Sequence, residues 1–255
     1  MSNIWVICRK ELKGYFASPI AYGLMVFFAV ISGYFFYVST GMFVVRGMES
    51  QMTGRAMPMD IAEWIIRPLL ANVSVIGLFM IPMITMRLFA EEKRSGTIEL
   101  LTTSPVTDAQ IIVGKWLSAV MMYGCILMVS ALNLLWLFAY GKPDWKPILV
   151  GYLGLLLQGA ALLAIGTFIS TCTKNQIIAG VATFAVCLLL WVLSWYSAFD
   201  TSKTAKVISY LSVVEHFESF SKGVLDTKDL VFYASVIFFG LFLTARSMES
   251  LRWRS

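Results

Sequence analysis

The densest group of charged side chains lies between residues 87 and 101, where acids and bases alternate with large apolar residues. The acids and bases can form ion pairs with a partner protein, and the apolar side chains can fill a groove on it. The residues concerned are Arg87, Glu91, Glu92, Lys93, Arg94, Ser95, Gly96, Thr97, Ile98, Glu99, Leu100 and Leu101. This chemistry is binding and not catalysis. The alternative interpretation is a solvated loop whose charges only hold the topology.

The local pattern of this segment predicts a short rigid element. Ser95-Gly96-Thr97 interrupts the polar stretch, and residues 98–103 are predicted to form a short helix that Ser104-Pro105 closes. A compact helix of this kind on a membrane face would be a suitable handle for a partner.

Motifs for nucleotide or metal chemistry are missing from the sequence. It contains no G-x-x-x-x-G-K-[ST] loop, so we expect the chain not to bind ATP itself, and it contains no H-E-x-x-H motif. The four cysteines are scattered without a C-x-x-C pair, which indicates packing thiols. The single histidine, His216, lies beside Glu215 and Glu218. We interpret it as a plain surface or interface residue, with a metal ligand or proton relay as the alternative. We expect no enzyme activity and no cofactor in this chain.

Long uncharged runs on either side of the charged segment predict the elements that carry it. The chain has 255 residues, of which 58% are hydrophobic and only 14% charged, whereas a soluble domain has about 25% charged residues. Six uncharged runs of 16 to 32 residues cover 14–45, 68–86, 116–141, 147–173, 175–199 and 230–245. About 20 apolar residues in a helix cross a bilayer, and a helix pairs its own backbone groups in lipid. The runs predict an all-α integral membrane protein with six spans at about 20–40, 68–89, 110–140, 148–170, 177–199 and 230–246.

Segments outside the spans have their own patterns. Residues 4–16 place apolar residues on one helical stripe, which predicts an amphipathic helix in the membrane interface before the first span. Residues 41–67 are predicted to form a loop on the far side, with a short interfacial helix inside it as the alternative. Residues 207–220 are predicted to form an amphipathic helix on that same side, before the last span. Together with the spans they would make one transmembrane domain over residues 1–255.

The start of the third span has a recognisable cap. Thr107-x-x-Gln110 is a capping-box pattern. Lys115 follows close to this start, and we expect its stem to snorkel outward to the membrane surface. Asp226 and Asp229 offer a similar cap and a first-turn acid for the last span.

Polar side chains are rare inside the spans. No acidic residue lies in the middle of one, which disfavours an ion-coupled secondary transporter. The main mid-span polar residues are Asn72, Asn133 and Gln158. We expect them to form hydrogen bonds between helices, with lining of a pathway as the alternative. A patch of small residues suits close helix packing, within the chain or between subunits: Gly159, Ala160, Ala161 and Ala164.

Six spans place both termini on one side of the membrane. With the termini inside, the inner segments hold eleven of the 20 basic residues, which is a weak positive-inside signal. No cleavage pattern follows the N-terminal basic residues, so we expect the first span to be retained.

Three segments resemble the permease subunits of type-2 ABC transporters, most of all the branch associated with gliding motility and nitrous-oxide reductase maturation. They are residues 9–22 (RKELKGYFASPIAY), residues 87–106 (RLFAEEKRSGTIELLTTSPV), and residues 216–226 (HFESFSKGVLD) with Asp229. The second segment is the most specific, and its one departure is Thr102, where the family often has a further leucine. The resemblance covers essentially the whole chain.

The resemblance implies the transmembrane permease of an ABC exporter. Two permeases, identical or related, would pair in a bacterial inner membrane with both termini cytoplasmic. Two separate ATPase subunits would hold ATP and Mg and bind the segment 87–101, which would be the coupling helix. An envelope protein and membrane lipid are further expected partners, and nucleic acid is not, because no dense basic tract occurs. The alternative function is a mechanical or scaffolding module that passes ATPase-driven motion to an envelope partner without moving solute.

Overall fold

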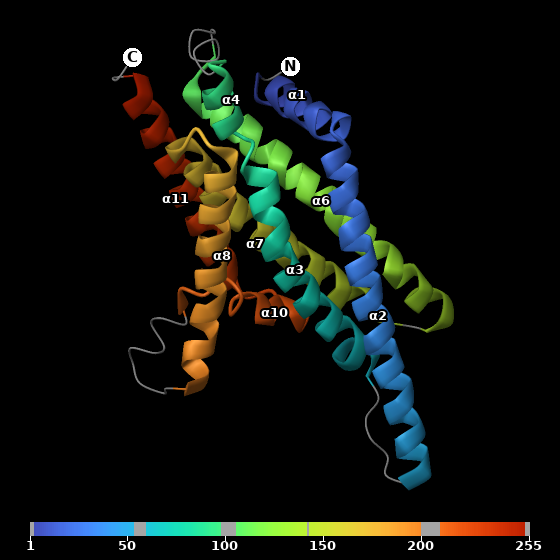
Figure 1. The fold of residues 1–255 in the computed structure, drawn as a ribbon. Coiled ribbons are helices and arrows are strands. Elements are labelled where there is room, and N and C mark those ends of the chain that lie inside the picture. Colours follow the sequence, from blue (N-terminus) through green and yellow to red (C-terminus); the bar gives the residue numbers. More distant parts are fainter. Residues whose placement is uncertain (1–2, 54–59, 98–105, 142, 200–209, 253–255) are drawn as a thin grey trace.

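The computed structural model describes residues 3–53, 60–97, 106–141, 143–199 and 210–252, and every regular element within these ranges is a helix (Figure 1). Six helical stretches in the described residues are long and apolar enough to cross a membrane. They are Pro19–Thr53, Ala62–Ser95, Asp108–Tyr140, Trp145–Cys172, Gln176–Trp195 and Thr227–Ser250. The predicted class, an all-α integral membrane protein with six spans, is confirmed.

The helices follow one another as α1 (Asn3–Ala17), α2 (Pro19–Thr53), the π-helix η1 (Ala62–Ile66), α3 (Arg67–Thr85), α4 (Ala90–Ser95), α6 (Asp108–Tyr140), α7 (Trp145–Cys172), α8 (Gln176–Phe199), α10 (Phe217–Ser221) and α11 (Thr227–Arg252). The N-terminal helix α1 is present as predicted and lies along α6. Both ends of the chain lie at the same end of the bundle, together with α4 (Figure 1). We call this the terminal end and the opposite one the far end.

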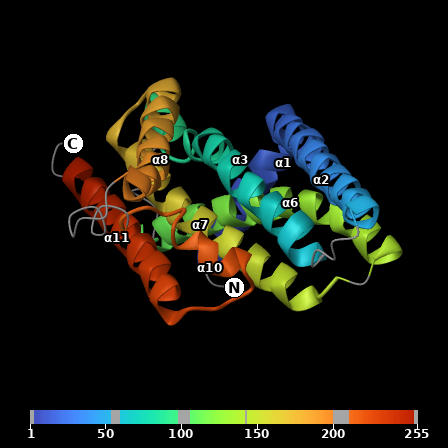
Figure 2. The ribbon, with the colours of Figure 1, turned by 90° about the horizontal axis from the view of Figure 1, so that it is seen from below.

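Two helices form the centre of the bundle. Helix α7 packs on α3, α6, α8, α10 and α11 (Figure 2). In the most apolar 18-residue stretch of each span, 67% is buried in the second span and 61% in α7, but only 17% in α8 and 17% in α11. The chain therefore surrounds α3 and α7 and leaves α8 and α11 largely uncovered.

Small residues on α7 allow its neighbours to come close. A Cβ atom on Gly159 would lie 2.1 Å from Cε1 of Tyr123 on α6, and Ala164 lies against Gly240 of α11. Of the two predicted roles of the small-residue patch, packing within the chain or between subunits, the structure shows packing within the chain.

Hydrogen bonds between spans use two of the three predicted residues. The Ser74 hydroxyl on α3 donates to Oε1 of Gln158 on α7 at 2.8 Å, and Nδ2 of Asn133 on α6 donates to the Ser32 hydroxyl on α2 at 3.4 Å. This confirms the predicted helix–helix role for Gln158 and Asn133. For Asn72, the described residues show no such bond.

The expected loop at 41–67 is wrong from Ala62 on, because η1 and then α3 are helical, and also as far as Thr53, because helix α2 is longer than predicted. Its 35 residues rise about 52 Å, well beyond the roughly 30 Å of hydrocarbon. No proline interrupts it after Pro19. The extension is held to η1 because the Arg46 guanidinium lies 4.1 Å from the centre of the Trp64 ring.

The single amphipathic helix predicted for residues 207–220 is also wrong in the described part. Residues 211–216 form turns, and α10 has only five residues. Val213, Phe217 and Phe220 are buried, whereas Tyr210 and Leu211 are about half exposed, so the expected stripe does not lie on one helical face. The chain turns because His216 bonds inward, as described below.

The predicted caps are present. The Thr107 side chain accepts from Gln110 N, and the Gln110 side chain accepts from Thr107 N, which completes the capping box of α6. Asp226 accepts from Lys228 N at the start of α11. Helix α3 stops at Thr85, four residues before the predicted end, where the Thr85 hydroxyl bonds back to the carbonyl of Ile81.

Gly159→Ala tests the close approach of α6 and α7. The added methyl group would overlap the rigid Tyr123 ring, so we expect a loss of about 1–3 kcal/mol in the free energy of unfolding. The measurement is reversible unfolding of the purified protein in mixed micelles.

Gly124→Ala is the matched control, because its Cβ would lie 3.7 Å from Leu156, an ordinary contact. Its stability should stay within about 0.5 kcal/mol of the original or rise. Equal effects of the two substitutions would contradict the packing described here.

Candidate functional site

A buried lysine organises the terminal end of the bundle. The Lys115 side chain, on α6, is only 1% exposed. Its Nζ atom donates to Oε1 of Glu11 on α1 at 3.1 Å and to Oε1 of Glu92 on α4 at 2.8 Å. The third bond goes to the carbonyl of Leu88 at 2.8 Å. An ammonium has three donors, so all of them are used. We call Lys115, Glu11, Glu92 and the Leu88 carbonyl the Lys115 cluster.

The Lys115 cluster joins three elements that are far apart in the sequence. A buried ammonium is costly unless it is paired and hydrogen-bonded. Glu11 and Glu92 keep some solvent access, at 20% and 17% exposure of their side chains. The Phe89 ring adds a cation–π contact, with its centre 5.2 Å from Nζ. The predicted outward snorkelling of Lys115 is therefore wrong, because two carboxylates compensate its charge inside the protein.

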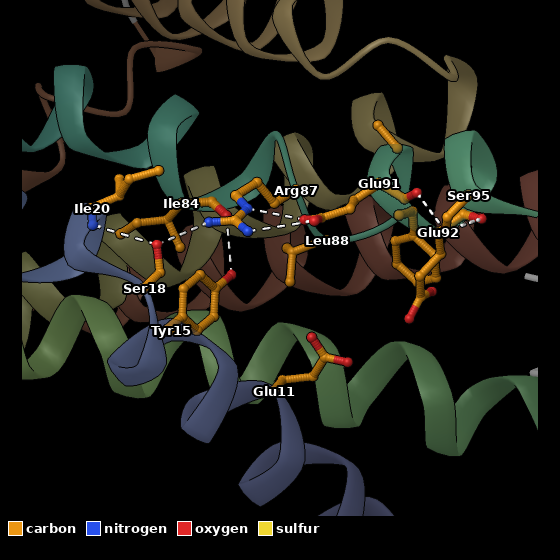
Figure 3. Close-up of polar contacts among 12 residues, drawn as sticks. Glu11, Tyr15, Ser18, Ile20, Ile84, Arg87, Leu88, Glu91, Glu92 and Ser95 are labelled. Carbon is orange, nitrogen blue, oxygen red and sulfur yellow. Dashed lines mark hydrogen bonds and ion pairs between the residues drawn. The ribbon is translucent and has the colours of Figure 1, made fainter. Parts of the chain in front are cut away.

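Beside the cluster, a second set of polar contacts attaches the end of α3 to α1 (Figure 3). The Arg87 guanidinium donates to both carboxylate oxygens of Glu91, at 2.9 and 3.4 Å, in a fork geometry. Its Nη1 atom donates to the Ser18 hydroxyl at 3.4 Å. The Tyr15 hydroxyl donates to the carbonyl of Ile84 at 3.0 Å. Burial, and next the charge of Glu11, raises the pKa of Tyr15, so this phenol keeps its proton and remains a donor.

On its other side, α4 is attached to α7. The Ser170 hydroxyl accepts from the backbone N–H groups of Phe89 and Ala90, both at 3.1 Å. The Lys93 ammonium donates to the carbonyl of Thr171. The Thr171 hydroxyl bonds to the Ser247 hydroxyl of α11 at 2.9 Å. Helix α4 is thus connected to α6 and α7 directly, to α1 through Lys115 of α6, and to α11 through α7.

The exposed part of the predicted segment begins at the end of α4. Arg94, Ser95, Gly96 and Thr97 are exposed. Gly96 has φ +73°, a left-handed conformation that ends α4 without the strain a side chain would bring. Within the described part of the chain, Arg94 forms no ion pair. Ile98, Glu99, Leu100 and Leu101 lie outside the described residues.

Most charged side chains of residues 87–94, which we predicted to bind a partner protein, bind other groups of this chain instead. Arg87 and Glu91 pair with each other, Glu92 pairs with Lys115, and Lys93 binds the end of α7. A role of residues 87–101 in ATPase coupling stays a prediction. Sequence reasoning did not find Lys115 or Glu11 as members of the site. The signal available was a lysine at the edge of an uncharged run, which is equally typical of a snorkelling residue.

At the far end, a second buried charged pair fixes α10 to α11. Nδ1 of His216 lies 2.7 Å from Oδ1 of Asp229, and Nε2 lies 2.9 Å from the carbonyl of Tyr210. The imidazole stacks on the Phe232 ring, with centroids 3.8 Å apart. His216 is 5% exposed and Asp229 is 1% exposed. The interpretation of His216 as a plain surface residue is therefore wrong.

The bonds of His216 restrict its protons. A carbonyl oxygen only accepts, so Nε2 must carry a hydrogen. The hydrogen bond between Nδ1 and Oδ1 needs one further proton between the two atoms. With that proton, the imidazole and the carboxyl group together have no net charge. A pair without net charge is the form in which such groups are tolerated in an apolar interior. The second carboxylate oxygen of Asp229, Oδ2, is buried without a hydrogen-bond partner among the described residues. We find no group of three or more possible metal ligands among the described residues.

Comparison with known proteins gives the family. A model of the ABC-2 family transporter proteins matches residues 50–214, which is more than half of the chain and includes α4 and the start of α6. The chain belongs to the ABC-2 transporter family. This confirms the resemblance to type-2 ABC permeases, whose ATPase is a separate subunit. It also agrees with the prediction that this chain is not itself an enzyme.

Among curated proteins, this ABC-2 family member is similar to the "Probable multidrug ABC transporter permease YbhR" of Escherichia coli K12 and to the same protein of strain O157:H7. The identity is 22% over 165 residues. The matched stretch covers 64% of this chain and 44% of the relative, so it spans less than half of the relative's length.

Lys115→Met tests the cluster. The substitution keeps the length and most of the volume of the side chain but leaves Glu11 and Glu92 without their cation, so we expect a loss of about 3 kcal/mol in the free energy of unfolding. The double variant Lys115→Met/Glu92→Gln should lose less than the sum of the two single variants.

Lys10→Met is the control, because Lys10 is 69% exposed and lies 3.9 Å from the same carboxylate of Glu11. An exposed pair of this kind contributes at most about 1 kcal/mol. Strictly additive losses in the double variant would mean that Lys115 and Glu92 do not interact.

His216→Phe tests the far-end pair in the same way. It leaves the Asp229 carboxylate buried without a cation, and we expect a loss of about 3–5 kcal/mol in unfolding free energy. The double variant His216→Phe/Asp229→Leu should recover most of that loss, since it removes both polar groups. If the double variant were as unstable as the single one, the bond of Nε2 to the Tyr210 carbonyl, which both variants lack, would matter more than the pairing with Asp229.

Proposed function

We propose that this ABC-2 family member is the transmembrane permease subunit of an ATP-binding-cassette exporter and is driven by a separate ATPase subunit. The observation that carries the proposal is the attachment of α4 to α6 and α7, and through Lys115 to α1, at one end of the bundle. A partner that moves α4 moves all three together, because each contact involves a charged or fully buried group.

The exposed tip of α4 is the proposed contact with the ATPase. Arg94 is exposed and is available for an acidic partner. The left-handed turn at Gly96 directs the chain away from α4 toward residues 98–101, the rest of the proposed coupling segment. In this arrangement the outer side of the segment binds the partner, and the inner side, through Glu92 and Lys93, transmits its movement to the spans.

The remaining parts of the proposal follow from this role. Two ATPase subunits hold ATP and Mg, and two permeases, identical or related, pair in the membrane. The terminal end faces the cytoplasm of a bacterium, with the inner membrane as the location. The relative's printed name refers to multidrug transport, so small organic compounds are the first substrate class to test.

One observation favours the alternative, a mechanical or scaffolding module that acts on an envelope protein. At the far end, α2 continues beyond the length needed to cross the bilayer. Its last turns expose Met42, Val45, Met48 and Met52 by 55 to 90%. An apolar helix face outside the membrane is typical of a binding surface for another protein. The two functions share the ATPase and differ in whether solute moves.

The coupling proposal is tested with the ATPase that co-purifies with the tagged chain from its native membrane. Arg94→Glu reverses an exposed charge and should reduce permease-stimulated ATP hydrolysis at least fivefold while the melting temperature stays unchanged. Gly96→Pro forces φ to about −65° where the turn needs +73°, and it should abolish stimulation.

Lys146→Glu is the matched control, because Lys146 is exposed at the far end of α7. It should leave stimulation unchanged. Full stimulation in both Arg94→Glu and Gly96→Pro would exclude this segment as the coupling element. ATP-dependent movement of a fluorescent organic cation in vesicles that contain the complex supports export, and its absence despite normal ATP hydrolysis supports the mechanical module.

A further inference from the structure

A large apolar groove in the described part of the chain lies between α8 and α11. Both helices pack on α7 but hardly on each other (Figure 2). The space between them has a volume of about 1040 Å³, which is the size of a site for a small molecule with an apolar body. Its walls come from α7, α8, α11 and the turn at residues 211–213, and they include Ile165, Phe168, Leu190, Phe232, Phe239 and Leu243.

The groove offers hydrocarbon and almost nothing else to an occupant. Its one hydroxyl, that of Ser235, donates to the carbonyl of Val231 at 2.7 Å and is therefore already bonded. A sugar, peptide or nucleotide would lose its hydrogen bonds with water on entering. The groove also lies within the spans that contain α7, α8 and α11, where the surrounding solvent is the acyl chains of the bilayer.

Charge at the two ends of the groove distinguishes the leaflets. On α11, Phe232, Phe239 and Leu243 lie on one helical stripe that reaches Arg246 at the terminal end. Lys174, in the turn between α7 and α8, is exposed and forms no ion pair with any described residue. The positive N-terminus of α8 follows it directly. The Thr171 hydroxyl at the end of α7 bonds to the hydroxyl of Ser247, next to Arg246, at 2.9 Å, so Lys174 and Arg246 belong to the same end of the bundle. Glu249 pairs with Arg246, and Lys174 therefore supplies the unpaired positive charge there.

At the far end, the described lysines nearest the start of α11 are both paired, and Glu215 adds an exposed acid. Lys228 pairs with Asp226 at 3.0 Å, and Lys222 pairs with Glu218 at 2.5 Å. A ligand with a long hydrocarbon part and an anionic head group therefore fits with its head at the terminal end. Anionic phospholipids have this chemistry, and basic residues at the membrane surface attract them.

We propose that the groove between α8 and α11 holds the acyl chains of an anionic phospholipid from the leaflet on the side of the termini. Lys174 and Arg246 bind its phosphate. The site does not depend on the ATPase, so it stands or falls separately from the coupling proposal. A lipid at this position fills the gap beside α7 and supports the two least buried spans.

Native mass spectrometry of the full chain tests the proposal. The delipidated protein is mixed with phosphatidylglycerol or with phosphatidylcholine of the same acyl chains, and the bound lipids are counted. We expect preferential retention of phosphatidylglycerol, by about fivefold for each basic residue that contacts the phosphate. Lys174→Gln/Arg246→Gln should remove the preference, and Lys146→Gln, an exposed lysine at the far end, should keep it.

A second pair of variants tests the groove itself. Ala234→Trp places a large ring among the lining residues and should prevent retention of both lipids. Val181→Trp places the same ring on the exposed face of α8 outside the groove and should not. Circular dichroism should show the same helix content for all variants, since each changed position is exposed.

Three results would overturn the proposal. One is equal retention of the two lipids by the original chain. Another is equal retention by Ala234→Trp and Val181→Trp. The third is a change of oligomeric mass in Ala234→Trp with an unchanged lipid count, which would show that a second copy of this chain occupies the groove.

Discussion

The buried ammonium of Lys115 is the constraint on which the terminal end of this protein depends. A charge in an apolar interior must be compensated where it lies, so Glu11 of α1 and Glu92 of α4 have to meet at the same point of α6. That meeting places the N-terminal helix along α6 and holds the chain between α3 and α4. The bonds of Arg87 and Ser170 then fix the same segment from the two remaining sides.

The far end follows the same physics with different groups. His216 and Asp229 form a neutral buried pair that folds α10 back against the bundle. Between the two ends, glycines of α7 receive the side chains of its neighbours, and Gln158 and Asn133 add hydrogen bonds between spans. The bundle has a well-buried centre, α3 and α7, and largely uncovered spans, α8 and α11.

This division bears on how the proposed ATPase coupling and the proposed lipid binding are arranged in this ABC-2 family member. The segment α4 is exposed at its tip and bonded at its base. In the proposed coupling, a force on the tip would reach α6 and α7 directly and α1 through Lys115. The uncovered spans lie on the opposite side of α7 from α2 (Figure 2), and the groove between them is where the membrane itself can become part of the structure. Coupling and lipid binding therefore concern separate surfaces of one helix bundle.

The amino-acid sequence by itself determined the class, the six spans and the position of the charged segment, because hydrocarbon excludes charge and the uncharged runs are long enough to cross it. It also determined the capping box at Thr107 and Gln110, which is a local interaction. Tertiary structure alone decided that Lys115 turns inward, that His216 is buried, and that α2 continues to Thr53. These outcomes depend on which side chain from a distant segment meets each residue. Glu11 is 104 positions from Lys115, and the residue pattern of either helix alone cannot predict that the two meet.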